Sequence, residues 1–180
     1  FALKISPDNT KDMKDDEVRI DVDNIYNLNR ISSNDTIEGG ASLTYGSDFT
    51  IFDGSDSREV FGLKIANNLR LEENKDLPAN HQINQKTSDF FGEIAYSPNE
   101  ILTTKYNTSV KNNLNEVTYE NFSSKIKINN FVTTFEYINE NNTSESNSYV
   151  VNDTSYSFDN KSNLSFSTRE NKKNNLTEYY

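Results

Sequence analysis

The sequence predicts an all-β protein, namely a segment of an antiparallel, up-and-down transmembrane β-barrel with about nine strands. Three observations support this fold class. Apolar residues recur at every second position along most of the 180-residue chain, whereas a helical period is hard to find. The polar connections between these runs alternate in length. The 10 Tyr and 11 Phe residues exceed what disordered chains carry, so the rings have a folded surface to cover.

The clearest alternation covers residues 37–52, where the odd positions are mainly apolar and the even positions are polar or glycine. A tight-turn composition follows at residues 53–56, and a second alternating strand covers residues 58–71. The apolar faces of these two strands carry Ile37, Ala41, Leu43, Tyr45, Phe49 and Ile51, then Phe61, Leu63, Ile65, Leu69 and Leu71.

The rest of the chain predicts one strand before this pair and six strands after it. Residues 1–6 form a short first strand, and residues 7–35 form a long loop. A polar connection at 72–87 precedes the later strands. The apolar set slips from odd to even positions in the sixth strand, which predicts a bulge. The later strands are expected at about 88–97, 102–110, 116–126, 131–138, 149–158 and 164–169.

The order of connection lengths is long, short, long, short, moderate, short, moderate, short. Outer-membrane barrels have short periplasmic turns and longer external loops, with an apolar face toward lipid. A Greek-key sandwich would also show one apolar face, but it has no reason to alternate its loops in this way. We therefore expect residues 1–180 to be one partial barrel domain, incomplete at both ends.

Composition excludes several classes of function. The net charge of -10 and the pI near 4.6 argue against a nucleic-acid partner, because phosphate recognition needs clustered Lys and Arg. No Cys and one His leave no thiolate chemistry and make a zinc site improbable. We expect His81 to be solvent-exposed, and the acidic clusters at 15–17, 21–23 and 53–56 to keep loops solvated, because the calcium-loop pattern is missing. No catalytic residue, cofactor or metal is predicted.

Several glycines lie inside the predicted strands, where glycine normally weakens a sheet. We expect Gly39, Gly40, Gly46 and Gly62 to bend the sheet toward closure, in preference to admitting another element close to the backbone.

Residues 29–40 read NRISSNDTIEGG and are followed by a Tyr45-Gly46 dipeptide. This segment resembles the C-terminal barrel of the LptD family of LPS-assembly proteins, also called organic solvent tolerance proteins, in which a loop N-R-x-S-G-x-D-R-x-E-G-G leads into a strand with a Y-G dipeptide. Ser33 replaces a Gly of that pattern and Thr36 replaces its second Arg, so the ion pair of that Arg is not carried over. Residues 86–92 resemble the family's S-D-x-x-G strand start, and residues 175–180 resemble the approach to its last strands.

The resemblance implies a non-enzymatic part of a large barrel in the outer membrane of a Gram-negative bacterium. Such a barrel, with an LptE-like lipoprotein plugging its lumen, would receive lipopolysaccharide (LPS) from a periplasmic bridge and insert it into the outer leaflet. Membrane lipid would surround it. The alternatives are another outer-membrane channel or receptor barrel, or a secreted β-rich adhesin or passenger domain.

If the apolar face meets lipid, the polar positions of the first two long strands face a hydrated lumen that accommodates a charged saccharide. These candidate lumen-facing residues are Glu38, Ser42, Thr44, Asp48, Lys64, Asn68 and Arg70.

Overall fold

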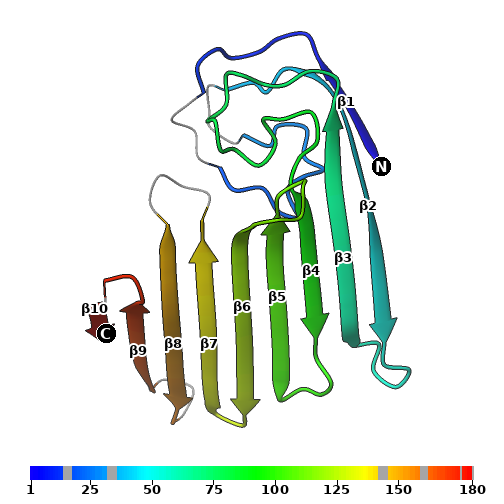
Figure 1. Ribbon diagram of the computed structural model, residues 1–180. Helices are drawn as coiled ribbons and strands as arrows, with labels where there is room; N and C mark the ends of the chain where they lie inside the picture. Colours follow the sequence, from blue (N-terminus) through cyan, green and yellow to red (C-terminus); the bar gives the residue numbers. More distant parts are fainter. Residues whose placement is uncertain (14–17, 32–35, 142–145, 159–161, 175, 180) are drawn as a thin grey trace.

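The computed structural model describes residues 1–13, 18–31, 36–141, 146–158, 162–174 and 176–179. These residues form one ten-stranded antiparallel sheet in which each strand pairs with its neighbours in the chain (Figure 1). The described residues contain no helix that could cross a membrane. The strands are β1 (Ala2–Ser6), β2 (Gly40–Phe52), β3 (Glu59–Arg70), β4 (Phe90–Tyr96), β5 (Leu102–Val110), β6 (Val117–Ile128), β7 (Phe131–Glu140), β8 (Asn147–Ser157), β9 (Asn163–Asn171) and β10 (Leu176–Tyr179).

The predicted strands and their order are confirmed, and no strand boundary differs from the prediction by more than three residues. The tenth strand lies where the sequence only suggested the approach to further strands. The predicted bulge is present at the start of β6, where the partner of Ser109 is Tyr119 and the partner of Val110 is Val117. Thr118 is the extra residue, and it shifts the apolar residues after it to the other parity.

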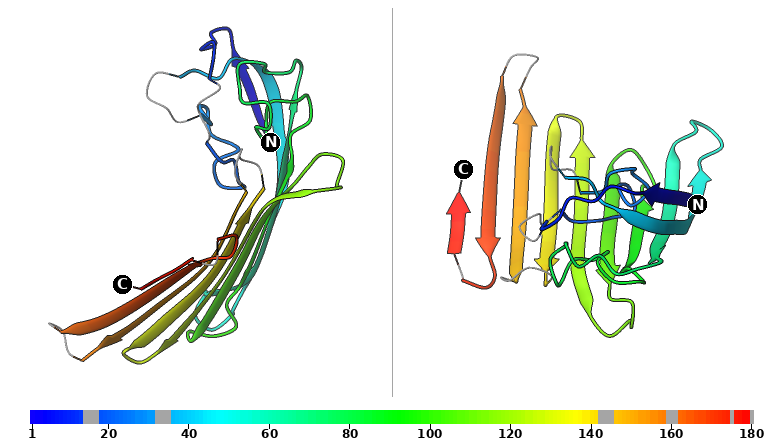
Figure 2. Two further views of the ribbon diagram at one scale, coloured as in Figure 1. Left: turned by 60° about the vertical axis from the view of Figure 1, so that its left-hand side comes forward. Right: turned by 90° about the horizontal axis from the view of Figure 1, so that it is seen from above.

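The connections divide the sheet into two ends. The turns β2–β3, β4–β5, β6–β7 and β8–β9 lie at one end, which we call the short-turn end, and the other connections lie at the long-loop end (Figure 1). The sheet is curved and open, and β1 and β10 form its two edges within the described residues (Figure 2). The alternation of connection lengths predicted from the sequence is therefore present.

The two faces of the sheet differ in polarity. The convex face carries large apolar side chains that are exposed on every strand from β1 to β10 except β5, including Leu43, Ile65, Ile94, Phe135 and Phe166. On β2 the exposed apolar residues extend from Leu43 near the long-loop end to Phe52 at the short-turn end, whereas on β8 and β9 they are Tyr156, Leu164 and Phe166 in the short-turn half. This apolar belt extends across the sheet, as the lipid-facing band of a barrel does.

The hydrophobic core lies on the concave face and is built mainly from connections. The described parts of residues 7–39 and 71–89 fold back over the long-loop half of the concave face, and we call them the loop cap (Figure 2). The sequence reads as polar here, and the prediction of plain connections missed this core. The sheet contributes Ala66 and Phe91, and the cap contributes Met13, Ile20, Val22, Ile25, Ile31, Leu77 and Ile83.

Candidate functional site: a buried charge cluster beneath the loop cap

The seven residues predicted to face the lumen all belong to the concave side. Strand pairing places Ser42 opposite Arg70, Thr44 opposite Asn68 and Asp48 opposite Lys64. Five of the seven are buried beneath or beside the loop cap, whereas Asp48 is exposed and Lys64 is half-buried. The buried five are Glu38, Ser42, Thr44, Asn68 and Arg70. The alternation of the sequence predicts that these residues share one face of the sheet. It does not predict that the chain's own loops cover them.

Glu38 is the centre of a buried charge cluster. It lies just before β2, and its carboxylate receives cations from three other parts of the chain. Lys4 of β1 places Nζ 2.8 Å from Oε2, and Arg30 of the loop cap donates from Nε to Oε2 over 2.9 Å. Arg30 Nη2 and Arg70 Nη1 both donate to Oε1. The cluster thus joins the loop cap to the first three strands.

Among the described residues, the cluster carries more positive than negative charge. Arg30 and Arg70 are 2% and 7% exposed, and Glu38 is 1% exposed. Further acceptors come from the Ser42 hydroxyl, 3.3 Å from Arg30 Nη2, and from the Gly39 carbonyl, 2.6 Å from Arg70 Nη2. Burial alone would raise the pKa of Glu38, but the hydrogen bonds and charges of Arg30 and Lys4 outweigh it and lower the pKa to about 2. The carboxylate is therefore ionised at physiological pH and holds the cations in place.

The two glycines after Glu38 explain the shape of this motif. A Cβ on Gly39 would lie 2.5 Å from Cβ of Asn9 and 2.8 Å from the Asp8 carbonyl oxygen, so the start of the cap can approach only a glycine here. Gly40 has a φ of +91°, which L side chains rarely adopt. Gly46 likewise admits the Tyr26 hydroxyl, 2.4 Å from where a Cβ would lie. At Gly39 and Gly46 the expectation of simple sheet curvature was therefore wrong, because another element approaches the backbone.

A second set of charges lies farther along the concave face. Lys64 Nζ is 3.1 Å from Oδ1 of Asp23 in the cap and 3.2 Å from Oε1 of Glu93 on β4. Lys105 of β5 places Nζ 2.7 Å from Oε2 of Glu93. This row of alternating charges links the cap to three strands, and Lys105 is 40% exposed in its side chain at the edge of the cap.

His81 is buried, so the prediction of a solvent-exposed side chain was wrong. It is 7% exposed because residues 71–89 fold onto the sheet beside the apolar core. Burial lowers the pKa of His81 to about 4, so the imidazole is neutral at physiological pH. Its neighbour Gln82 accepts from the backbone N–H of Ile20 over 2.7 Å and donates to the Ser109 hydroxyl over 2.8 Å, which fastens both cap segments to β5. No sequence signal marked Gln82.

The predicted acidic clusters serve local structure where they can be described. Asp21 Oδ1 accepts from the backbone N–H groups of Asp23 and Asn24, each over 2.9 Å, and Asp53 accepts from that of Ser55 over 2.8 Å. Residues 15–17 lie outside the described part of the chain. Within the described residues, no group of three or more His, Cys, Asp or Glu side chains is placed to hold a metal ion.

The concave face therefore offers ion pairs and hydrogen bonds. Such a face can pass or hold polar molecules, while the convex face suits lipid.

A comparison with protein-family models matches residues 12–177 to LptD, LPS transport system D. Comparison with curated proteins gave no match, and neither did comparison with solved structures. Of the motif residues, Asn29, Arg30, Thr36, Glu38 and the two glycines are described, whereas Ser32, Ser33 and Asp35 lie outside the described part. Since the match spans almost the whole chain, this chain belongs to the LptD family of LPS transport and assembly components of the Gram-negative outer membrane.

Proposed function

We propose that this chain forms part of the barrel wall that inserts LPS into the outer leaflet. The observation that carries the proposal is the two-faced sheet, with large apolar side chains exposed across the convex face and polar ones on the concave face. Exposed apolar patches of this extent mark contact with a partner or a membrane. Lipid against the convex face satisfies these side chains, and the concave face then lines the lumen.

The transport step needs no covalent chemistry. An LPS headgroup is a phosphorylated saccharide, and it requires a hydrated path with hydrogen-bonding groups. We infer that the path follows the short-turn half of the concave face of β5–β9, because the cap covers the long-loop half (Figure 2). Lys105, Asn121 and Lys125 share this face through the pairing of β5 with β6. The predicted lumen residues then divide into two groups: Asp48 and the half-buried Lys64 remain accessible from the lumen, although Lys64 also pairs with Asp23 of the cap, and the buried five hold the cap.

The same concave face is the surface proposed for an LptE-like plug lipoprotein. The loop cap already covers the long-loop half of this face as far as the start of β6, so the plug would contact the surface that the cap leaves open. LPS would reach this region from a periplasmic bridge. Lys125, Glu136, Asp153 and Arg169 would meet the plug or the passing saccharide, since their registers place them on the concave side.

A depletion experiment tests the transport role. The complete protein is placed under conditional expression in its host, and surface LPS and total LPS are measured separately. Loss of the protein is expected to lower surface LPS while total LPS continues to accumulate, and re-expression is expected to restore the surface pool. Normal surface LPS after depletion would contradict the role.

Site-specific photocrosslinking tests the direction of the two faces. A photoreactive residue at Lys105 is expected to capture LPS or the plug lipoprotein, because Lys105 lies on the concave face. The matched position is Tyr106, the next residue on β5, which lies on the convex face and is expected to capture membrane lipid but no plug. Plug capture at Tyr106 and not at Lys105 would reverse the assignment of the faces.

A further inference from the structure

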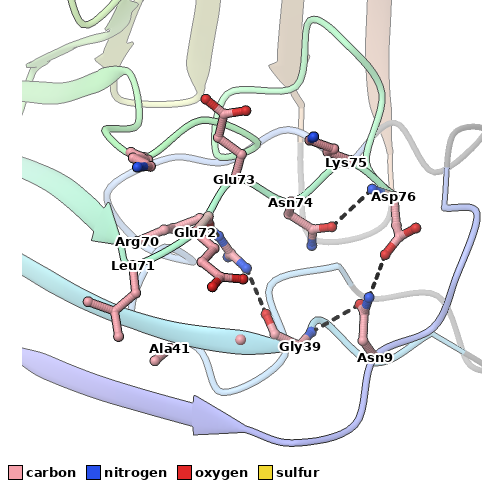
Figure 3. Close-up of a pocket in the computed structure, with 12 residues that line it drawn as sticks. Asn9, Gly39, Ala41, Arg70, Leu71, Glu72, Glu73, Asn74, Lys75 and Asp76 are labelled. Atoms are coloured by element: carbon pink, nitrogen blue, oxygen red, sulfur yellow. Dashed lines mark hydrogen bonds between the residues drawn. The ribbon is translucent and has the colours of Figure 1, made fainter.

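A hollow of 840 Å³ lies at the long-loop end of β2 and β3, between the two segments of the loop cap (Figure 3). Arg70 and Gly39 line it whereas Glu38 does not, and none of the roles above uses it. Its walls combine apolar, amide and charged groups, with Asn9, Gly39, Gly40, Ala41, Arg70, Leu71, Glu72, Glu73, Asn74, Lys75, Asp76 and Lys86 as the lining residues.

Asn74 presents a buried hydrogen-bond donor that lacks a partner. The residue is 7% exposed, and its Oδ1 accepts from the backbone N–H of Asp76 over 3.1 Å. Its Nδ2 has no hydrogen-bond partner among the described residues, and in Figure 3 the amide nitrogen points into the hollow. An unsatisfied buried donor is costly, and an acceptor oxygen on a ligand would remove that cost.

The charged groups around this amide are of both signs. Arg70 is engaged by Glu38, and Asp76 Oδ2 accepts from Asn9 Nδ2 over 2.5 Å. By contrast, the side chains of Lys75, Lys86, Glu72 and Glu73 form no ion pair within the described residues. Ammonium groups bind phosphate oxygens, and carboxylates accept hydrogen bonds from sugar hydroxyls. The free groups therefore match a phosphorylated saccharide.

One side of the hollow continues into the apolar convex face. Leu71 lines the hollow and is 76% exposed, and its backbone N–H bonds to the Ala41 carbonyl over 3.1 Å. Leu43, Leu69 and Ile5 lie next along the same face and are also exposed. A ligand in this position meets polar groups at one end and apolar surface at the other, which is the geometry that an amphiphile needs.

We propose that this hollow binds the phosphorylated saccharide headgroup of an LPS molecule in the outer leaflet, while the acyl chains lie along Leu71 and the adjoining convex face. The inference rests on the proposed function for the orientation of the sheet in the membrane. The volume lies in the upper part of the range of ligand pockets and exceeds what a single phosphate requires. The Asn74 amide and the two lysines hold phosphate oxygens, and the two glutamates accept from hydroxyls.

The test uses Asn74→Asp in the complete protein, purified with its complex in detergent and mixed with purified LPS. The new carboxylate keeps an oxygen for the Asp76 N–H but replaces the free donor with a negative charge. Asn113→Asp is the matched control, because Asn113 Oδ1 likewise accepts from the backbone N–H two residues later, over 3.3 Å, in another loop at the same end. We expect the affinity for LPS, measured by native mass spectrometry, to fall about tenfold or more in Asn74→Asp. The affinity should stay unchanged in Asn113→Asp.

A second variant keeps the test decisive if Asn74→Asp misfolds. Lys75→Gln/Lys86→Gln changes two exposed side chains that support no contact of the fold, and it is also expected to weaken LPS binding. Unchanged LPS binding in both variants overturns the proposal. Equal retention of phosphatidylglycerol and LPS by the unmodified protein overturns the saccharide assignment. Surface LPS is measured in depleted cells that express the unmodified protein or a variant. If the unmodified protein does not restore surface LPS, the transport role is refuted. The LPS-binding measurements alone test whether the hollow binds the headgroup.

Discussion

Replacing Glu38 with Gln should release the loop cap while leaving the sheet intact. The substitution keeps the side-chain shape but removes the carboxylate that pairs with the cluster's cations in the described part of the chain, so the buried guanidinium groups of Arg30 and Arg70 lose this counter-charge. Removing one partner of a buried ion pair typically costs about 3–5 kcal/mol. The lowered pKa gives a similar figure, since a shift from 4.5 to about 2 corresponds to about 3 kcal/mol of stability.

Hydrogen exchange measured by mass spectrometry on the complete protein in detergent would detect this release. Backbone amides of residues 18–31 and 71–89 should exchange more than 100-fold faster in Glu38→Gln, by conversion of about 3 kcal/mol. Amides of β7 and β8 should not change. Glu73→Gln, an exposed acid in the same cap, is the matched control. Exchange in the cap that is as slow in Glu38→Gln as in the unmodified protein would refute the reasoning.

Acid should release the same cap. Because the folded-state pKa of Glu38 is lowered, its contribution is complete above pH 4.5 and is lost as the pH falls toward 2. Cap exchange in the unmodified protein should therefore accelerate over that window, and the Glu38→Gln variant should lack this component.

Three further predictions concern the convex face, the buried histidine and the glycine contact. Ile65→Arg should destabilise the barrel in lipid by about 2–4 kcal/mol. Leu71→Arg should cost only about 0–1 kcal/mol, because Leu71 lies beyond the end of β3 at the rim. Equal denaturant midpoints for the two variants would contradict the placement of the apolar belt in lipid. Burial lowers the pKa of His81 from 6.5 to about 4, so the stability of the cap should fall by about 3 kcal/mol as the pH drops from 6.5 to 4. The His81→Gln variant should lack this pH dependence when amide exchange in the cap is measured. Gly46→Ala should lower stability by about 1–3 kcal/mol, because the new Cβ would displace Tyr26 or the Ile65 carbonyl. Gly54→Ala is the control: a Cβ there meets no atom within 4 Å, so this variant should melt like the unmodified protein.

Local patterns were sufficient to predict the strands, their order and the side of the sheet on which each long-strand residue lies. Alternation assigns a side chain to a face whatever lies beyond it, because successive residues of a strand point to opposite sides. Thus Thr44 and Asn68 were placed together on the concave side from the sequence, and strand pairing agrees. The slip of parity in β6 was enough to predict the bulge. The motif at residues 29–40 indicated the family that the comparison then matched.

The tertiary structure alone decided what covers the concave face. The loop cap depends on contacts between residues that are far apart in the chain, such as Ile20 with Gln82, 62 residues apart, and Glu38 with Arg70, 32 residues apart. Isolated Ile residues in a polar segment carry no periodicity, so nothing local distinguishes a buried cap from a solvated loop. For the same reason His81 read as exposed although it is buried. A strand's periodicity is a property of its own backbone, whereas the burial of an irregular loop is a property of what it folds against.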